Sequence, residues 1–409
     1  SSVPFYLTKF YSHTIGMSGR LRLAATGVQD QWLTGDPQFS YFLMNFRRHT
    51  KFAIDYVETQ FDGADLDFGK NLHYRIPNDK GDVIRNMTLK VTLSDPSPGG
   101  DEWCPSVISH LVESAELLIG GQTIEKLTGE YIYMHQQLHN TDDDTDQTVY
   151  FLNSHGQTIA YTGNYTYFMD LPFYFYRNPS LAIPTCALTK QLVEVKIKLR
   201  PLTELIEGGA SVGVSADILK CSIDTEFAFL TDSERRYLMT RPIDYVVTQV
   251  QMSKFVMKPG ENTKSVMLNF SHPVRELFFV SQSEEAVRDN HPHRYNTISN
   301  IKLQFNNTIV FDRDNDFLVY EQAFKHHVNS PYNYSASYNY LKSDFAMYSF
   351  ALQPEVYYPT GQVNMSRIAH KLLTIEIDPI NSVDNNNTRI YAVNYNLLRV
   401  SGGLAGLKF

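Results

Sequence analysis

The chain has 409 residues, of which 36 are basic and 44 acidic, so its formal net charge is −8. This acidic balance argues against a dedicated nucleic-acid-binding protein, which usually carries a basic surplus or stripe. The length predicts two or three domains, and the hydrophobic content of 43% is sufficient for large cores without disulfides or metals. Aromatic residues, 13% of the chain, favour strands.

The cysteines and the first residues predict a reduced protein without a membrane anchor. Cys104, Cys186 and Cys221 have no CxxC spacing, and three cysteines do not suggest a disulfide framework. The longest segment without Asp, Glu, Lys or Arg, residues 147–169, contains several Asn, Ser, His and Gln residues, so we expect no transmembrane helix. The first residues lack a basic segment followed by an apolar one, which predicts no signal peptide.

Alternating apolar and polar residues predict strands in both halves of the chain. In such a strand one face packs on a core and the other is solvated. The alternation occurs at residues 89–93, 195–199, 301–305, 373–377 and 391–397. Clusters of Gly, Pro, Asn and Asp between such segments predict turns. The pattern favours antiparallel sandwiches with one solvated face per sheet.

Helical candidates are few and short. Residues 233–241 predict a helix with Ser233 as its N-cap, and residues 319–328 have apolar residues at helical intervals. Neither segment is long enough for the crossover helices of a parallel α/β sheet.

A hairpin motif occurs once in each half. Residues 117–126, LLIGGQTIEK, predict two strands joined by a two-residue turn at Gly120 and Gly121. In the second half, residues 303–312, LQFNNTIVFD, repeat this pattern with two asparagines in the turn.

The spacing of the repeats predicts two copies of one β-module. The offset from Gly120 to Asn306 is 186 residues, and aligning Val195 with Ile375 gives an offset of 180. Nearly equal offsets over this span are the signature of a duplication. We expect the two copies to join near residues 231–242.

Nine segments follow one another in an order typical of one protein family. They include GVQDQWLTGDPQFSYF at 27–42 with its continuation at 46–53, ELLIGGQTIEK at 116–126 and PTGQVNMSRI at 359–368, and the others lie at 78–84, 170–199, 225–238, 269–277, 348–355 and 391–409. Together they resemble the major capsid proteins of nucleocytoplasmic large DNA viruses, a double jelly-roll family that includes algal-virus and mimivirus-type capsid proteins. The resemblance covers nearly the whole chain from Gly27.

The resemblance implies an all-β fold of two tandem eight-stranded antiparallel jelly rolls, which are β-sandwiches, with a few short helices in loops. We expect an N-terminal arm at residues 1–26, a first jelly roll at 27–235 and a second jelly roll at 236–409.

The resemblance also implies a structural protein without enzymatic activity. Three chains would form a pseudo-hexagonal capsomer that tiles the icosahedral shell of a large double-stranded DNA virus. The implied partners are other copies of the chain, minor capsid proteins and penton proteins, with no direct contact to nucleic acid. The expected location is the virion shell, near an internal viral membrane, after assembly in the host cytoplasm.

Several residues of the first family segment have a predicted structural role. Gly35 and Pro37 flank Asp36, a combination that favours a turn. Gln29 and Asp30 are expected to hold the arm through hydrogen bonds from side chain to backbone, or to contact another subunit.

The next segment combines basic and aromatic residues. Arg47 and Arg48, followed by His49, would face the particle interior, a neighbouring subunit or solvent. The aromatic side chains nearby are expected in the core of the first jelly roll: Tyr41, Phe42, Phe46 and Phe52.

Seven Asn-X-Ser/Thr sequons are candidate glycosylation sites, although Asn-rich loops are the simpler explanation in a chain without a signal peptide. They lie at Asn86, Asn164, Asn269, Asn306, Asn333, Asn364 and Asn386.

No segment predicts a metal or cofactor site. Asp312, Asp314 and Asp316 match the first three ligand positions of an EF-hand, but Phe317 and Ala323 stand where Gly and Glu are required.

Two further groups of polar residues were weighed as ligands. The acidic segment 141–146 is either a solvated loop or a cation site between loops. Four histidines are expected at the surface rather than on a metal: His291, His293, His326 and His327. We therefore expect neither a metal nor a cofactor.

Two functions other than a capsid role stay open. The first is a lectin-like, carbohydrate-binding β-sandwich whose sugar platform would consist of Tyr332, Tyr334, Tyr338 and Tyr340. The second is a β-rich hydrolase, for which the sequence nominates no pair of carboxylates. The usual nucleotide-binding, zinc-protease and serine-hydrolase motifs are absent.

Overall fold

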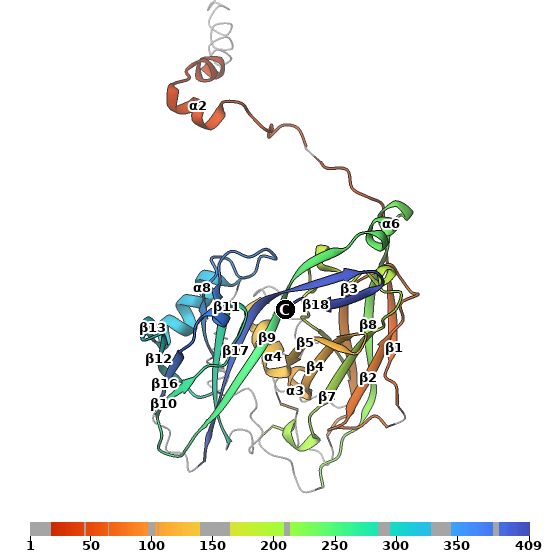
Figure 1. Cartoon of the computed structure of the whole chain (residues 1–409), viewed down its shortest axis with the longest axis vertical. Coiled ribbons are helices and arrows are strands. Elements are labelled where there is room, and N and C mark those ends of the chain that lie inside the picture. The colour runs from red at the N-terminus through yellow and green to blue at the C-terminus, as the bar shows by residue number, and fades with distance from the viewer. Residues whose placement is uncertain are drawn as a thin grey trace, which may run out of the picture. The chain divides into compact units, whose positions relative to one another are not determined.

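The computed structural model describes residues 18–44, 46–63, 65–96, 103–104, 106–139, 164–207, 213–284, 295–328, 345–378 and 384–409. The chain separates into two compact units, Ser1–Thr50 and Lys51–Phe409. The first unit contains the helix α2 (Val28–Thr34) and carries no buried side chain among its described residues. The second unit contains all the described β-strands (Figure 1).

Two four-stranded antiparallel sheets form the first jelly roll of the second unit. One sheet has the order β1 (Ala53–Gln60), β8 (Ile218–Phe229), β3 (Val83–Leu93) and β6 (Tyr165–Asp170). The other has the order β2 (Asn71–Ile76), β7 (Val193–Leu199), β4 (Val112–Ile119) and β5 (Gln122–Thr128). Their inner faces share one hydrophobic core, as expected for a sandwich.

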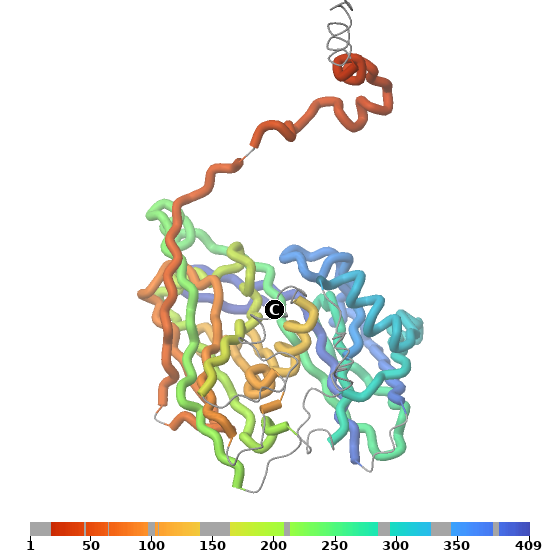
Figure 2. Tube along the Cα trace, turned by 180° about the vertical axis from the view of Figure 1, so that it is seen from behind, coloured from red at the N-terminus to blue at the C-terminus, as the bar shows by residue number. Residues whose placement is uncertain are grey.

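The second jelly roll repeats this arrangement strand by strand. Its sheets have the orders β9 (Ile243–Met257), β17 (Asn386–Ser401), β11 (Pro273–Ser283), β14 (Ala346–Ser349) and β10 (Thr263–Met267), β16 (Lys371–Ile377), β12 (Ile298–Phe305), β13 (Thr308–Asp314). Two short strands extend the first of these sheets, β15 (Val363–Asn364) beside β11 and β18 (Leu404–Leu407) beside β17. The predicted fold class, two tandem antiparallel jelly rolls, is confirmed. In the trace of Figure 2 the two rolls separate by colour.

Both predicted hairpins form. In each, the register of the two strands shifts just before the turn, at Leu117/Leu118 in the first and at Leu303/Gln304 in the second. The turn residues have positive φ angles, 59° at Gly120, 81° at Gly121, 47° at Asn306 and 67° at Asn307. Two consecutive residues with positive φ are typical of a type I′ turn, which glycine and asparagine tolerate best.

The pairing of the strands refines the predicted repeat. Leu117 pairs with Val195 in the first jelly roll, and Leu303 pairs with Leu373 in the second. The counterpart of Val195 is therefore Leu373, at an offset of 178, rather than Ile375 at 180. Since side chains alternate between faces along a strand, this shift of two residues keeps the predicted core face unchanged.

Short helices fill the connections between strands. They are α3 (Val107–Leu111), α4 (Gly129–His139), α6 (Asp232–Thr240), α8 (Gln322–His326), η2 (Pro179–Leu181), η3 (Thr185–Ala187), η4 (Leu202–Glu204), η5 (Phe317–Glu321) and η6 (Met365–Arg367). The predicted helix at 233–241 is α6, but its N-cap is Thr231 instead of Ser233. The candidate at 319–328 consists of the π-helical turn η5 followed by α8. The longest of these helices, α4, was not predicted, because its side chains are buried on nearly every face and show no amphipathic period.

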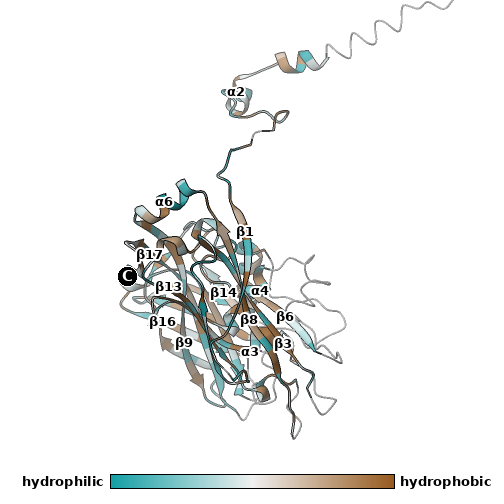
Figure 3. Ribbon diagram, turned by 90° about the vertical axis from the view of Figure 1, so that its right-hand side faces the viewer, coloured by the Kyte–Doolittle hydropathy of each residue, from teal (hydrophilic) through white to brown (hydrophobic). Residues whose placement is uncertain are grey.

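The expectation of a solvated face at 391–397 is wrong for β17, and β11 beside it is likewise buried on both faces. Leu277 and Phe279 face the core of the second roll, whereas Phe278 and Val280 on the opposite side belong to the core of the first. The long strands β9 and β17 run between the two rolls (Figure 1). Figure 3 shows that hydrophobic residues concentrate on the strands, whereas much of α6 is hydrophilic.

The predicted core position of four aromatic residues is also wrong. Tyr41, Phe42, Phe46 and Phe52 are 90%, 96%, 75% and 51% exposed. The first strand of the sandwich begins only at Ala53, so these residues precede the sheet and have no strand that could carry them into the core.

Gly129 gives a test of the packing beneath α4. A Cβ atom at this position would lie 1.9 Å from the carbonyl oxygen of Val112 and 2.3 Å from that of Ser109. Backbone atoms cannot yield as a flexible side chain does, so we expect Gly129→Ala to lower the free energy of unfolding by roughly 2–3 kcal/mol. Guanidinium unfolding measures this change.

Gly406→Ala is the matched control, because its nearest neighbour would be the Gln122 side chain at 3.4 Å. We expect this variant to change stability by less than about 0.5 kcal/mol. Equal losses in the two variants would contradict the packing argument.

Candidate functional site

A cluster of charged residues lies where the two jelly rolls meet. The first roll contributes the end of β5 and the helix α4, and the second contributes β11, β17 and the segments around α8. Charged groups removed from water are stable only when they are paired and hydrogen-bonded. The distances and hydrogen bonds of each ion pair therefore show how its charges are stabilised.

The first pair joins α4 to β17. Arg389 donates from Nε to Oε2 of Glu130 at 2.7 Å and from Nη2 to Oε1 at 2.6 Å, which is a bidentate arrangement. The Tyr391 hydroxyl also donates to Glu130, and Arg389 reaches Gln282 on β11. Burial alone would raise the pKa of Glu130, but Arg389 outweighs it and lowers this pKa below its ordinary value.

The second group is a chain of ionisable residues around His327, the residue that follows α8. Arg275 donates to Glu276 Oε1 at 2.6 Å, and Glu276 Oε2 lies 2.8 Å from His327 Nε2. On the other side of the ring, His327 Nδ1 lies 3.0 Å from Glu355 Oε1. His139 at the end of α4 completes the group, with its Nε2 atom 3.8 Å from the same Glu355 oxygen.

Burial and charge set opposite states for the two histidines. Burial lowers the pKa of His139 to about 4, helped by the positive charge of His327. For His327, burial acts in the same direction, but Glu276 and Glu355 outweigh it and raise the pKa to about 9. The pKa of Glu276 falls to about 2, since Arg275 and His327 overcome the effect of its burial.

The prediction that His327 lies at the surface is therefore wrong. Its side chain is 2% exposed and contacts two carboxylates. Its neighbour His326 points to the carbonyl oxygen of Leu352 instead, as expected when adjacent side chains diverge.

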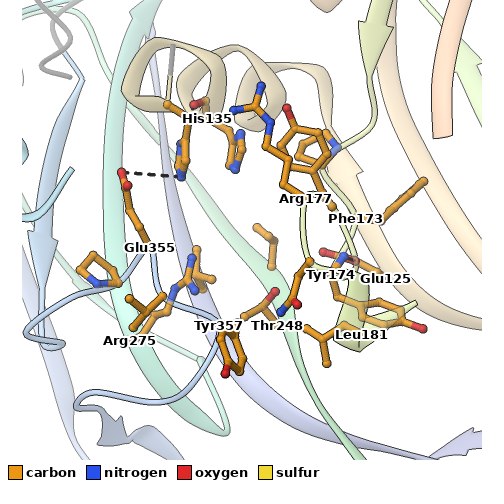
Figure 4. Close-up of a pocket in the computed structure, with 18 of the residues that line it drawn as sticks. Glu125, His135, Phe173, Tyr174, Arg177, Leu181, Thr248, Arg275, Glu355 and Tyr357 are labelled. Carbon is orange, nitrogen blue, oxygen red and sulfur yellow. Dashed lines mark hydrogen bonds and ion pairs between the residues drawn. The ribbon is translucent and has the colours of Figure 1, made fainter. Parts of the chain in front are cut away.

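A cavity of about 420 Å³ opens beside this cluster. Glu355 and Arg275 of the second roll lie on one side of it, and Glu125 and Tyr174 of the first roll lie on another (Figure 4). Glu125 accepts a hydrogen bond from the Tyr174 backbone N–H at 2.7 Å. Burial raises the pKa of Glu125 to about 8, so its carboxyl group is mostly protonated at neutral pH. The paired charges hold segments of the two rolls against each other.

Where the sequence predicts a turn in the first unit, the chain bends at Gly35 and Asp36, and Asp36 has a φ of 48°. Gly35 caps α2, and a Cβ atom there would lie 2.4 Å from the carbonyl oxygen of Gln31. Asp30 makes the expected backbone hydrogen bond, accepting from the Gly27 N–H at 2.8 Å. Gln29 lies exposed on the same helix, and Pro37 is exposed after it.

The basic pair and most described sequons are at the surface. Arg47 and Arg48 are both exposed, as are the sequon residues Asn164, Asn269, Asn306 and Asn364. Asn86 is half-buried on β3. Asn386 is 4% exposed and hydrogen-bonded to Asn296, so it does not offer a surface acceptor in the folded chain.

Other candidates are partnered or outside the described part of the chain. Asp312 is hydrogen-bonded to Asn300 and paired with Lys302, as in an ordinary surface hairpin. The acidic segment 141–146 lies outside the described residues, as do Asn333, His291, His293 and the tyrosines Tyr332, Tyr334, Tyr338 and Tyr340.

Sequence reasoning missed the buried cluster, although it leaves a recognisable signal. Arg275 and Glu276 directly precede the apolar run 277–280, and Arg389 directly precedes the run 390–393. A charge at the start of a continuous apolar strand indicates a strand covered on both faces with a paired ion at its end.

Among the residues described, the structure contains no helix of the length and apolar character that crossing a bilayer requires.

Comparisons with known proteins agree over both halves. Residues 40–231 match a family model described as the major capsid protein N-terminus, and residues 234–406 match one described as the large eukaryotic DNA virus major capsid protein. A major capsid protein of Pyramimonas orientalis virus is 34% identical, over 96% of this chain and 99% of the relative. That of Paramecium bursaria Chlorella virus 1 is 27% identical, over 96% of this chain and 100% of the relative.

The fold agrees as well. The quasi-atomic model of the PBCV-1 virus capsid superposes with a TM-score of 0.76 at 21% identity, covering 90% of this chain and all of the other.

Glu125→Gln tests the protonated buried carboxyl group. The folded chain holds this proton up to about pH 8, whereas the unfolded chain releases it near 4.5, so the wild type loses stability as the pH rises between these values. The glutamine variant has no such proton. We expect it to equal the wild type near pH 5 and to exceed it by roughly 3–4 kcal/mol near pH 8 in guanidinium unfolding. A difference that does not grow with pH would contradict this.

Glu130→Gln, five residues further on, should behave in the opposite way. Because Arg389 lowers the folded pKa of Glu130, the carboxylate stabilises the folded chain above about pH 4.5, and this contribution fades as the pH falls through the folded pKa. We expect the variant to lose about 3 kcal/mol near pH 7, where Arg389 stays buried without its partner, and less in acid. The same unfolding experiment measures it, and a loss that grows on acidification would refute the assignment.

Proposed function

Because the chain belongs to the major capsid protein family of large eukaryotic DNA viruses, we propose that three copies of it form one pseudo-hexagonal capsomer. The protein is a structural component of the virion shell and not an enzyme. Each chain supplies two jelly rolls, so that three chains supply six similar blocks. Such capsomers, set side by side, would tile an icosahedral shell.

The contact between the two rolls of one chain carries this proposal. It is heterologous, because β9 and β17 of the second roll contact β5 and α4 of the first. In a heterologous contact the two partners use different surfaces. The pair of rolls therefore still has one free copy of each surface, and these can bind further chains. If the rotation between successive chains closes, the repeated contact produces a ring.

The two unused surfaces carry exposed apolar side chains. The strand orders of the two rolls make β1 and β8 the counterparts of β9 and β17, and α8 follows β13 as α4 follows β5. Ile54 and Tyr56 on β1 are 41% and 65% exposed, and Phe324 on α8 is 83% exposed. In the proposed ring, α8 and β13 of one chain pack on the outer faces of β8 and β1 in the next.

The first unit adds a second source of contacts between subunits. Trp32, Tyr41 and Phe42 are 88%, 90% and 96% exposed. Apolar side chains of this size gain stability by leaving water, and clusters of them on a surface mark interaction sites. We propose that this segment, with Arg47 and Arg48, binds neighbouring subunits or minor capsid proteins.

The family matches, which meet between residues 231 and 234, support the proposed boundary between jelly rolls at 27–235 and 236–409. The unit boundary at Thr50 favours an arm that is longer than residues 1–26. The wider setting is part of the same proposal: assembly in the host cytoplasm, penton proteins as neighbours, an internal membrane beneath the shell, and no direct contact with the genome.

The proposed ring can be tested by the mass of the assembled chains in solution and by two variants that should disrupt the contact between them. Size-exclusion chromatography with light scattering should give the wild type a mass three times 46.9 kDa. Tyr56→Glu and Phe324→Glu each place a charge in the proposed contact, and we expect both to shift the chain toward the mass of a monomer.

Met267→Glu is the matched control. Met267 is 46% exposed on β10, which has no part in the proposed contact, so this variant should remain a trimer. A wild type that stays monomeric at 46.9 kDa under capsid-like conditions, or a control that dissociates as fully as the two variants, would refute the ring.

A further inference from the structure

Three potential metal ligands from separate segments converge beside the cavity between the rolls. The ligand atoms of His139, His327 and Glu355 lie within 4.8 Å of one another. Glu355 Oε1 is 3.0 Å from His327 Nδ1 and 3.8 Å from His139 Nε2. Two ligands bound to one tetrahedral zinc ion at its usual bond lengths are about 3.4 Å apart, so both measured distances are close to that spacing.

The other nitrogen of each imidazole already has an acceptor. His139 Nδ1 lies 2.8 Å from the carbonyl oxygen of His135, and His327 Nε2 lies 2.8 Å from Glu276 Oε2. Zinc-binding histidines nearly always donate their second N–H to a backbone carbonyl or a carboxylate, which orients the ring and fixes its tautomer. Both arrangements occur here, and in each ring the remaining nitrogen faces Glu355. In the metal-free chain His327 Nδ1 is hydrogen-bonded to Glu355, so a zinc ion would take the place of the proton between them and release it to solvent.

The charges around the group also suit a divalent cation. Glu276 is paired with Arg275, so its charge is balanced within the protein. Glu355 supplies the remaining carboxylate, and its side chain is 25% exposed. His139 and Glu355 both line the cavity of about 420 Å³, from which water can supply a fourth ligand.

We propose that His139, His327 and Glu355 form a structural zinc site that links the two jelly rolls. His139 ends α4 in the first roll, whereas His327 follows α8 and Glu355 lies between β14 and β15 in the second. A bound ion therefore connects segments that are 188 and 216 residues apart from His139. Such a link stabilises the folded chain by holding the rolls together.

Zinc uptake by the full-length chain without an affinity tag tests the proposal. After chelator treatment and dialysis, we expect the wild type to bind one zinc ion per chain, by elemental analysis, and to unfold at a higher temperature with zinc than without it. Cobalt in place of zinc should give the intense visible absorption of a four-coordinate site. Less than one equivalent bound by the folded wild type would overturn the proposal.

Two variants locate the ion and one serves as a control. Changes to outer contacts of zinc ligands alone weaken binding 10- to 100-fold, so we expect Glu355→Gln and His139→Gln to weaken it by roughly 100-fold or more. His326→Gln, whose ring points to Leu352, should bind zinc as the wild type does. Equal affinity in the Glu355 variant, the His139 variant and the control would overturn the assignment. If either ligand variant fails to fold, the wild-type stoichiometry and cobalt spectrum still decide the question.

Discussion

Burial of both faces of β11 and β17 is the constraint on which the arrangement of the two rolls depends. These strands belong to the second sandwich by hydrogen bonding, yet several of their side chains pack into the first. Phe278 and Val280 face one core, and Leu277 and Phe279 face the other. Because interiors are packed densely, a strand shared in this way fixes the position of each roll to within the fit of its side chains. The two modules thus share a continuous hydrophobic core across their contact.

The ions at this contact follow from the same burial. A charged residue buried between the two rolls must be paired. The bidentate contact of Arg389 with Glu130 forms in only one relative position of the rolls. Buried pairs add little net stability compared with apolar residues of equal size, but breaking one is unfavourable. We infer that the pairs select the register of the two rolls, while the apolar residues around them supply the stability.

The features that could be predicted from the sequence are those determined by residues close together in the chain. The hairpin turns at Gly120 and Asn306 were predictable because positive φ angles restrict the residue types at those positions, and the duplication followed from their spacing. The sequence did not predict α4, whose buried surround removes the periodic signal, or the burial of His327, which depends on carboxylates from two other segments. The exposed aromatic residues such as Phe42 were misplaced for a related reason, since composition alone does not say whether a partner for them lies in the same chain.

The strands β3 and β11 show why the burial of a strand was harder to predict than the strand itself. The two strands hold equivalent places in their sheets, but β3 alternates between buried and half-buried residues along most of its length, whereas β11 is buried almost throughout. The fold is the same, so the difference arises from what covers the outer face: another roll in the case of β11 and, among the described residues, only partial cover in the case of β3. Alternation therefore reports the surroundings of a strand rather than its existence. A duplicated fold with unequal patterns in its two copies contains information about assembly, because the copy that still alternates is the one whose outer face remains available to a neighbouring subunit.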